Sequence, residues 1–528
     1  MGISRSMVAG AVGLGLLGSA CLAMPSAAIA QGALIWGTPA EADALDPHAM
    51  GGWIGRSITK QIYESLLEED LTDPRAKAVT LKPALAKDWK VTEGGKVWTF
   101  YLREGVKFHD GTPFDANAVK FNFDRFLDEK APQYYPKAKG FMVGFAKWID
   151  RVEVLDPLAI RVTLTAANYE WFQSGLQPYG VFLIISPTAI KKYGNEGIAL
   201  HPTGTGKFKF VEREQGVKIV LERNDDYWGQ KPKLDRIIVR VLEDPTTRVN
   251  ALLANEVNFI TTPPWDEIDN LKNAGYVLLI NENVPSIWYV SINMKHPILK
   301  DVRVRQALNY ALNREELAKR VFHGTATPAY GFLSRGTYAF DPDFKAYEYN
   351  PEKARKLLAE AGYPNGLDLT YQIPKYGQGE LWEQWLQRDL KKVGINVKIE
   401  KFEWISYMHE WTQGLKDSVG INEMGWGESI PSWAARQSRC DAVPPKGTNV
   451  GWYCNPKVDA LFDKGLAEED PEKTKQYYRE AQQLISDDAA FIPVVNDSQP
   501  VFLSKSVKGF VNPAQDWFDF STVWIEQH

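Results

Sequence analysis

The chain contains histidines, serines and carboxylates, which often act in catalysis or metal binding, but few of them lie at the sequence spacings that known catalytic or metal-binding motifs require. The histidines do not lie at metal-ligand spacing, and neither an H-E-x-x-H nor a G-x-S-x-G motif occurs. The seven histidines are His48, His109, His201, His296, His323, His409 and His528. We therefore predict no catalytic residue, no metal site and no cofactor. A hydrolase with two spatially paired carboxylates stays an alternative, because sequence spacing does not give their separation.

A glycine-rich segment, Gly204-Thr205-Gly206-Lys207, is similar to part of a phosphate-binding loop. Phe208 occupies the position at which such a loop needs Ser or Thr to hold magnesium. His201 occupies the position of the first glycine. We interpret the segment as a tight turn that leads into a strand at 208–211, and not as a nucleotide site.

The richest polar and aromatic stretch of the chain, at 425–433, reads G-W-G-E-S-I-P-S-W. Its glycines allow the backbone to approach a ligand closely, and Trp426 and Trp433 offer broad, rigid contact area. Glu428 and Ser429 add a hydrogen-bond acceptor and a hydroxyl group. We predict that this stretch binds a ligand; the alternative is a surface loop with one tryptophan packed inward.

The N-terminal thirty residues are typical of a secretory signal peptide. Arg5 is their only charged residue, an apolar run extends over 7–24, and A-I-A at 28–30 fits a cleavage site. We predict that residues 1–30 are removed and that the mature, soluble protein begins at about Gln31. An uncleaved anchor is the alternative. Lipidation of Cys21 is disfavoured, because G-S-A precedes it.

Removal of the signal peptide leaves two cysteines, Cys440 and Cys454. Two cysteines close together in an exported chain predict one disulfide, and two buried free thiols are the alternative. Closing a loop of about 15 residues stabilises a fold by roughly 3 kcal/mol.

Strand and helix patterns alternate along the rest of the chain. β-Branched and aromatic residues predict a strand at 97–102, and alternation predicts another at 395–399. Asp115, Asn350 and Asp470 are placed as N-caps of helices, the last two with proline at the next position. The interleaving indicates a mixed α/β or α+β class.

Length and charge set further bounds. The chain has 528 residues, which is more than one compact core usually holds, so two or three domains are expected. Its net charge of −5 argues against strong nucleic-acid binding, and its hydrophobic fraction of 44% is that of a globular protein.

Several motifs together resemble the family 5 extracellular solute-binding proteins of ABC importers, the group of dipeptide, oligopeptide and nickel receptors. The likeness covers nearly all of residues 35–525. The motifs are A-L-A-K-D-W at 84–89, W-T-F-Y-L-R at 98–103, V-K-F-H-D-G-T-P-F at 106–114, G-T-G-K-F-K-F at 204–210, L-E-R-N-D-D-Y-W at 221–228, D-V-R-V-R-Q-A-L-N-Y-A at 301–311, Y-N-P-E-K-A at 349–354 and A-G-Y-P at 361–364.

The resemblance implies a two-lobed periplasmic binding protein fold with a hinge, of the large peptide-receptor type. Lobe one is expected to comprise residues 31–285 plus 500–528, and lobe two residues 286–499. A monomer of this kind captures its ligand by cleft closure, without a chemical step, and delivers it to permease subunits in the inner membrane. A separate ATPase would supply the energy. Together with the predicted signal peptide, the resemblance makes the periplasm the expected location.

Site residues transfer from the family less completely. The family's aspartate-rich loop for the ligand amino group falls at 428–433, where only Glu428 remains acidic. The arginine for the ligand carboxylate falls near Lys375 and Tyr376, and lysine lacks the bidentate fork of arginine. Glu41 and Asp43 lie where family members line the cleft, although both also fit simple solvated acids.

The ligand therefore stays open between a peptide, an opine, a sugar conjugate and another small polar metabolite. Two alternatives come from other functional classes, namely an exported hydrolase and a periplasmic chaperone. The hydrolase would turn over a candidate ligand. The chaperone would be stabilised by unfolded proteins and by no small molecule.

Overall fold

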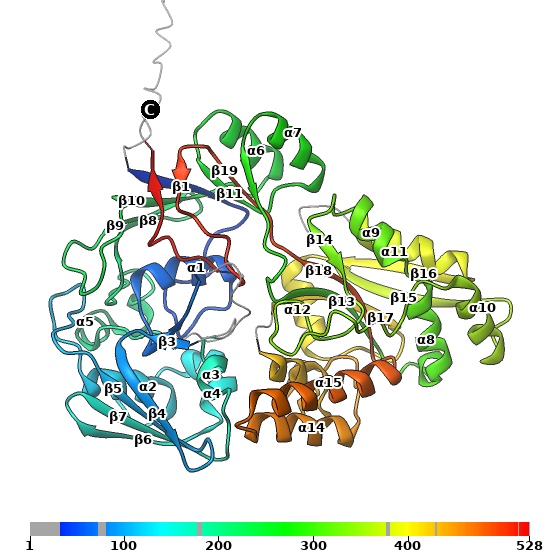
Figure 1. Ribbon diagram of the computed structural model, residues 1–528, viewed down its shortest axis with the longest axis horizontal. Coiled ribbons are helices and arrows are strands. Elements are labelled where there is room, and N and C mark those ends of the chain that lie inside the picture. Colours follow the sequence, from blue (N-terminus) through cyan, green and yellow to red (C-terminus); the bar gives the residue numbers. More distant parts are fainter. Residues whose placement is uncertain are drawn as a thin grey trace, which may run out of the picture.

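The computed structural model describes residues 32–526 except 72–80, 177–181, 376–380, 428–429 and 516. They form two lobes of helices and sheets that lie side by side in Figure 1. The predicted mixed α/β class is confirmed. The predicted signal peptide lies outside the described residues. Within them, no helix has the length and apolar character that a bilayer crossing requires.

A seven-stranded mixed sheet is the centre of lobe one, in the order β12-β19-β11-β1-β10-β9-β8. Strand β1 runs parallel to both of its neighbours, and all of its residues are buried, as expected for a strand covered on both faces. Helix α1 packs on one face, and helices α6 and α7 pack on the other. The bounds are β1 (Ala33–Thr38), α1 (Trp53–Ile62), β8 (Phe208–Glu214), β9 (Lys218–Arg223), β10 (Arg236–Val241), α6 (Pro245–Leu253), β11 (Phe259–Thr261), α7 (Ile268–Asn273), β12 (Val277–Leu279) and β19 (Val501–Leu503).

Lobe one also contains a four-stranded antiparallel sheet in the order β4-β5-β7-β6. The strand predicted at 97–102 is β5, and the helix predicted after Asp115 is α2, whose Ala118 amide donates to Asp115 at 2.8 Å. Aromatic residues of α2, α3 and α4 fill the core beneath this sheet. The bounds are β2 (Leu67–Glu69), β3 (Leu81–Pro83), β4 (Ala86–Thr92), β5 (Val97–Leu102), α2 (Ala116–Leu127), α3 (Pro136–Ala146), β6 (Ile149–Asp156), β7 (Ala159–Leu164), α4 (Trp171–Ser174), α5 (Pro187–Gly197), β20 (Val507–Lys508) and β21 (Trp524–Ile525).

Lobe two is built on a six-stranded mixed sheet in the order β14-β18-β13-β17-β15-β16. Asn350 and Asp470 cap helices α10 and α15 as predicted, and the strand predicted at 395–399 continues to Phe402. The bounds are β13 (Ser286–Ile292), α8 (Val302–Ala311), α9 (Arg314–Arg320), β14 (Ala326–Pro328), α10 (Pro351–Glu360), β15 (Leu367–Pro374), α11 (Leu381–Lys392), β16 (Ile395–Phe402), α12 (Trp404–Thr412), β17 (Ile421–Gly427), α13 (Ala435–Ser438), α14 (Pro456–Ala467), α15 (Pro471–Asp487) and β18 (Phe491–Asp497).

The chain passes between the lobes at 280–285, from β12 to β13, and at 498–500, from β18 to β19 (Figure 1). Strands β12 and β19 pair antiparallel in lobe one, and β13 and β18 pair antiparallel in lobe two. The two crossovers therefore connect one strand pair to another. Residues of both lobes line a cavity beside these crossovers.

The G-T-G turn at 204–206 leads into β8, as predicted. It also packs against the end of α1. A Cβ atom on Gly204 would lie 2.3 Å from the Ile62 carbonyl oxygen, so this close backbone approach requires glycine. The Thr205 hydroxyl donates to Glu64 at 2.8 Å, and Lys207 forms an ion pair of 3.2 Å with Asp519. The segment thus ties lobe one to its returning C-terminal chain.

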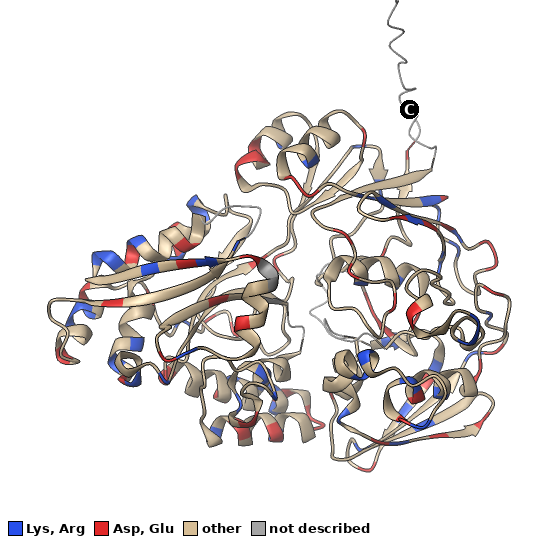
Figure 2. Ribbon diagram, turned by 180° about the vertical axis from the view of Figure 1, so that it is seen from behind, with Lys and Arg blue, Asp and Glu red and all other residues tan. Residues whose placement is uncertain are grey.

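Charged residues of both signs are mixed on both lobes in Figure 2. Many of them form local surface ion pairs, such as Lys120 with Asp124 at 2.7 Å. This mixture agrees with the small net charge of −5.

Candidate functional site

The cavity beside the crossovers, here called the hinge cavity, has a volume of about 430 Å³. Residues of both lobes and of the crossovers line it. They are Pro39, Trp53, Glu243, Pro245, Arg248, Thr261, Thr262, Pro263, Trp265 and Phe518 in the first lobe, and Ser286, Trp288, Trp382, Glu383, Gly425, Gly427, Asp497, Gln499, Pro500 and Val501 in the second lobe and the return. A ligand in this cavity would contact both lobes at once.

Four tryptophans supply much of the apolar wall of the hinge cavity. Trp53 comes from α1, Trp288 from β13 and Trp382 from α11, and the rings of Trp288 and Trp382 lie 6.1 Å apart. Trp265 packs its ring 4.5 Å from that of Phe322, which belongs to the opposite lobe. Rigid aromatic rings of this kind are suited to stacking against a small ligand.

The close contact between β17 and the Trp288 ring requires glycine at position 425. A Cβ atom at this position would lie 2.9 Å from the indole of Trp288, closer than real Cβ contacts allow. The glycine therefore lets the Trp288 ring lie flat against the strand next to the cavity.

The charged groups of the hinge cavity differ in how they are held. Arg248 donates to the carbonyl oxygens of Leu242 and Thr262 at 2.6 and 2.7 Å, so it fixes the rim of the cavity. Burial lowers the pKa of this guanidinium group to about 10. Asp497 accepts from the Trp288 indole at 3.3 Å, and burial raises the pKa of its carboxyl group.

The lobes also touch at the end far from the crossovers. The Tyr169 amide donates to the Leu466 carbonyl at 2.9 Å, and the Tyr169 hydroxyl donates to Glu469 at 3.2 Å. The Tyr338 hydroxyl donates to Glu170, and burial raises the pKa of this carboxyl group. The hinge cavity is thus enclosed between lobes that contact each other.

The structure places the two acids predicted near the start of lobe one in local interactions. Glu41 forms an ion pair of 2.6 Å with Arg213. Asp43 accepts from the backbone amides of Gly51 and Gly52, at 2.7 and 3.2 Å, and so holds the turn before α1. Neither side chain belongs to the lining of the hinge cavity.

The predicted residues of lobe two are spread over several places. The backbone of Trp426 lies in β17 opposite Ile287, between the cavity-lining Gly425 and Gly427. Trp433 is 6% exposed and stacks with Arg436 at 4.4 Å.

Lys375 follows β15, is exposed, and pairs with Glu403 at 2.6 Å. Tyr376, Glu428 and Ser429 lie outside the described residues.

Several lining residues were absent from the sequence-based prediction, above all Trp53, Trp265, Trp288, Trp382 and Asp497. They come from distant parts of the chain and share no local motif. The packing of helices and strands that are far apart in the sequence brings them together.

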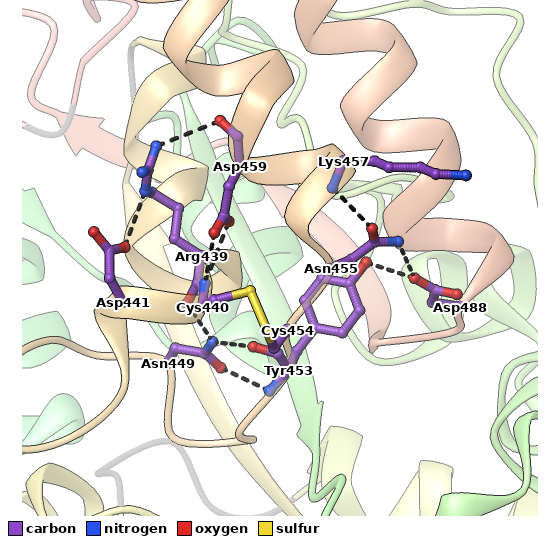
Figure 3. Close-up of a disulfide and its surroundings, with 10 residues drawn as sticks. All are labelled: Arg439, Cys440, Asp441, Asn449, Tyr453, Cys454, Asn455, Lys457, Asp459 and Asp488. Atoms are coloured by element: carbon purple, nitrogen blue, oxygen red, sulfur yellow. Dashed lines mark hydrogen bonds and ion pairs between the residues drawn. A yellow bond between two sulfur atoms is a disulfide. The ribbon is translucent and has the colours of Figure 1, made fainter.

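The predicted disulfide between Cys440 and Cys454 is confirmed, with a Cα–Cα distance of 4.4 Å (Figure 3). Asn449 lies inside the closed loop and donates to the carbonyl oxygens of Arg439 and Tyr453 at 2.9 and 2.6 Å. The Cys440 amide donates to Asp459 of α14 at 3.2 Å. The bridge therefore fastens the segment after β17 to α14.

Two lobes joined by two crossovers around a shared cavity define the class of two-lobed solute receptors with a hinge. The chain belongs to the bacterial extracellular solute-binding proteins, family 5, whose model matches residues 80–435. It is the solute-binding component of an ABC importer.

Curated relatives and solved structures agree with this assignment. The glutathione-binding protein GsiB of Shigella flexneri is 32% identical over 517 residues, which cover 94% of this chain and 95% of the relative. DppA of Helicobacter pylori, in complex with the peptide STSA, has a TM-score of 0.81 at 27% identity and covers 94% and 98% of the two chains. AgaA of A. tumefaciens R10, in complex with agropinic acid, has a TM-score of 0.77 at 25% identity, with coverage of 94% and 99%.

Proposed function

We propose that this protein binds a short peptide or peptide-like molecule in the hinge cavity, in the periplasm, and delivers it to permease subunits. The observation that carries the proposal is the cavity itself, of about 430 Å³, which both lobes and four tryptophans line. Its volume lies within the range of about 300–1,000 Å³ that small-molecule sites occupy. Glutathione, the ligand named for the curated relatives, is the first compound to test.

We further propose that lobe one comprises residues 31–285 plus 500–528 and that lobe two comprises residues 286–499. The strand pairs on either side of the crossovers support these boundaries. Because both lobes line the cavity, a ligand gains its full set of contacts only when they are together, which shifts the population toward closure.

The proposed contacts comprise the lining tryptophans, Asp497 and the residues at 426–429. Trp426, Glu428 and Ser429 stay in this proposal because Gly425 and Gly427, which border Trp426, line the cavity. Trp433, Lys375, Tyr376, Glu41 and Asp43 stay as proposed residues of a wider site.

An opine is the second candidate ligand. AgaA, which is similar over 94% of this chain, is in complex with agropinic acid. This observation favours a test of opines beside peptides.

Calorimetric titration of the purified mature protein with glutathione, a neutral tripeptide and an opine tests the proposal. We expect one of these classes to bind and to lower the radius of gyration in X-ray scattering. Trp53→Ala removes a cavity wall and is expected to weaken binding at least about tenfold, as loss of a buried aromatic contact does. Trp89→Ala, in the four-stranded sheet, is the matched control.

An unchanged scattering profile at saturation would contradict closure. Equal affinity of the Trp53 variant and the wild type would remove the hinge cavity from binding. Ligand recovered as a cleaved product would favour the hydrolase. Stabilisation by unfolded proteins alone would favour the chaperone.

A further inference from the structure

The ionisable side chains of the hinge cavity are mostly acidic. Among the lining residues that the structure describes, three carry a carboxyl group and one carries a guanidinium group: Glu243, Glu383, Asp497 and Arg248. Glu383 is 1% exposed, and its negative charge acts on Tyr371 of its own lobe. Because the charge of Glu383 is engaged within lobe two, Glu243 and Asp497 are the acids that a ligand would meet.

The basic side chain of the hinge cavity is already engaged with the backbone. Arg248 donates from all three guanidinium nitrogens to the carbonyl oxygens at 242–243 and 261–262, over distances of 2.6 to 3.2 Å. The carboxylate that acts on its pKa is that of Asp244, which lies outside the lining. Arg248 therefore has little capacity left to bind a carboxylate of the ligand, and the described lining contains no other basic side chain.

The two remaining acids come from different lobes. Glu243 precedes α6 and is exposed, whereas Asp497 ends β18. Within the described part of the chain, neither carboxylate forms an ion pair with a lysine or an arginine. Contact between the lobes thus brings two carboxyl groups to one cavity, and a cation would relieve the repulsion between them.

The Asp497 carboxyl group is held in place by hydrogen bonds. It accepts from the Trp288 indole at 3.3 Å and from the Gln499 amide at 3.0 Å. Burial raises the pKa of this carboxyl group, and a cation close to it would favour its charged form. The position is therefore suited to receive the positively charged end of a ligand.

Indole rings line the cavity together with these acids. They belong to Trp53, Trp265, Trp288 and Trp382. The face of an aromatic ring attracts an ammonium or guanidinium group that lies within about 6 Å of its centre. Among the described residues, no group of His, Cys, Asp and Glu side chains is arranged to hold a metal ion. Carboxylates beside indole rings fit an organic cation better than a bare metal ion.

We propose that the hinge cavity selects ligands that carry an organic cation, an ammonium or guanidinium group, which interacts with Glu243, Asp497 and the indole rings. The ligand needs no carboxylate in this cavity, because Arg248 is already bound to the backbone. The cation contacts groups of both lobes, so its binding favours the closed arrangement. This inference rests on the proposed function, since it concerns the same cavity.

The first test needs no ligand. The tryptophan fluorescence of the mature protein is quenched with caesium ions or with iodide at constant ionic strength, because an acidic cavity concentrates cations and repels anions. Trp53 and Trp265 are half-buried, so quenchers reach them. We expect Glu243→Gln to lower the quenching constant of caesium and to raise that of iodide.

The matched control for this test is Glu104→Gln, which removes the charge of an exposed acid outside the lining. Its two quenching constants should equal those of the wild type. Equal constants for Glu243→Gln and the wild type would overturn the proposal.

The second test compares trialanine, its C-terminal amide and its N-acetyl form by calorimetric titration. We expect the amide to bind at least as tightly as trialanine. The N-acetyl form lacks the cation and should bind about tenfold more weakly, as the loss of a hydrogen bond between charged groups does. Asp497→Asn should reduce the preference for the amide over the N-acetyl form, whereas Glu104→Gln should keep it.

Equal or tighter binding of the N-acetyl form relative to the amide would overturn the proposal. Failure of all three forms to bind would count against the proposed function. The quenching constants would still confirm or overturn the cation preference of the cavity, so the two failures are distinguishable.

Discussion

The Tyr338 hydroxyl of lobe two donates a hydrogen bond to the carboxylate of Glu170 of lobe one. Glu170 is 6% exposed and precedes the short helix α4, so the bond is shielded from water. Tyr169, the preceding residue, adds a backbone bond of 2.9 Å to Leu466 across the same boundary. These contacts exist only while the lobes touch. Loss of the hydrogen bond between Tyr338 and Glu170 should therefore destabilise the closed arrangement of the lobes.

Replacing Tyr338 by Phe is therefore expected to weaken ligand binding by about tenfold, or ~1.4 kcal/mol, because a buried carboxylate loses one of its hydrogen-bond donors in the closed state. The Tm of the ligand-free protein should change little. Tyr276→Phe is the control, since the Tyr276 hydroxyl donates to Leu252 within lobe one at 2.7 Å. Calorimetric titration checks the prediction, and equal affinities of the two variants would refute it.

The buried Glu64 is expected to give the protein a pH-dependent stability. Its carboxylate accepts from Thr205, Tyr227 and Trp228 at 2.8, 2.6 and 2.8 Å, yet burial raises its pKa from 4.5 to about 7. The folded protein therefore keeps a proton that the unfolded chain releases. The contribution of Glu64 to the free energy of unfolding should therefore fall by about 3 kcal/mol as pH rises through this window. The buried His48 and His109 act in the opposite direction, because burial lowers the pKa of each imidazole from 6.5 to about 4.

Urea unfolding from about pH 5 to about pH 8 measures this dependence. Glu64→Gln mimics the protonated acid, so the free energy of unfolding of the wild type minus that of the variant should fall as pH rises over this range. Glu153→Gln, on an exposed side chain, should leave it unchanged. Parallel curves for the wild type and the Glu64 variant would count against this role.

The disulfide predicts a specific thiol count. Mature protein under denaturing conditions should show no titratable thiol, whereas an uncleaved precursor should show one, from Cys21. Replacing both Cys440 and Cys454 by Ser should lower the free energy of unfolding by roughly 3 kcal/mol. Two thiols in the mature protein would be incompatible with the bridge.

Gly425→Ala is expected to disturb the hinge cavity, because the added Cβ would meet the Trp288 ring at 2.9 Å. Overpacking of this kind costs about 1–3 kcal/mol, so affinity should fall together with stability. Gly140→Ala, on α3 with open space around the added atom, is the control and should be neutral or slightly stabilising. Intrinsic tryptophan fluorescence and calorimetry report both effects.

The sequence predicted local structure well where a side chain fixes the backbone. Asp115 and Asn350 were identified as helix caps because their oxygens accept nearby backbone amides, and the structure shows both bonds. The disulfide followed from cysteine spacing in an exported chain. These signals depend on a few neighbouring residues.

The hinge cavity was harder to predict, because its walls meet only through long-range pairing. Trp53 and Trp382 are separated by more than three hundred residues and carry no local sign that they share a cavity. Asp43 shows the converse, since its place in the sequence suggested the cleft while its carboxylate holds a local turn. The family resemblance predicts that a cleft exists. Which side chains line it depends on long-range packing, which the sequence alone does not give.

The double crossover has a topological consequence. Because β12 and β19 are hydrogen-bonded neighbours, the whole of lobe two is inserted into lobe one as an enlarged hairpin loop. Joining the ends of β12 and β19 by a tight turn would leave every strand of the seven-stranded sheet in place. Lobe one could then be produced as an autonomous half-receptor, in which one wall of the binding site is studied without its counterpart.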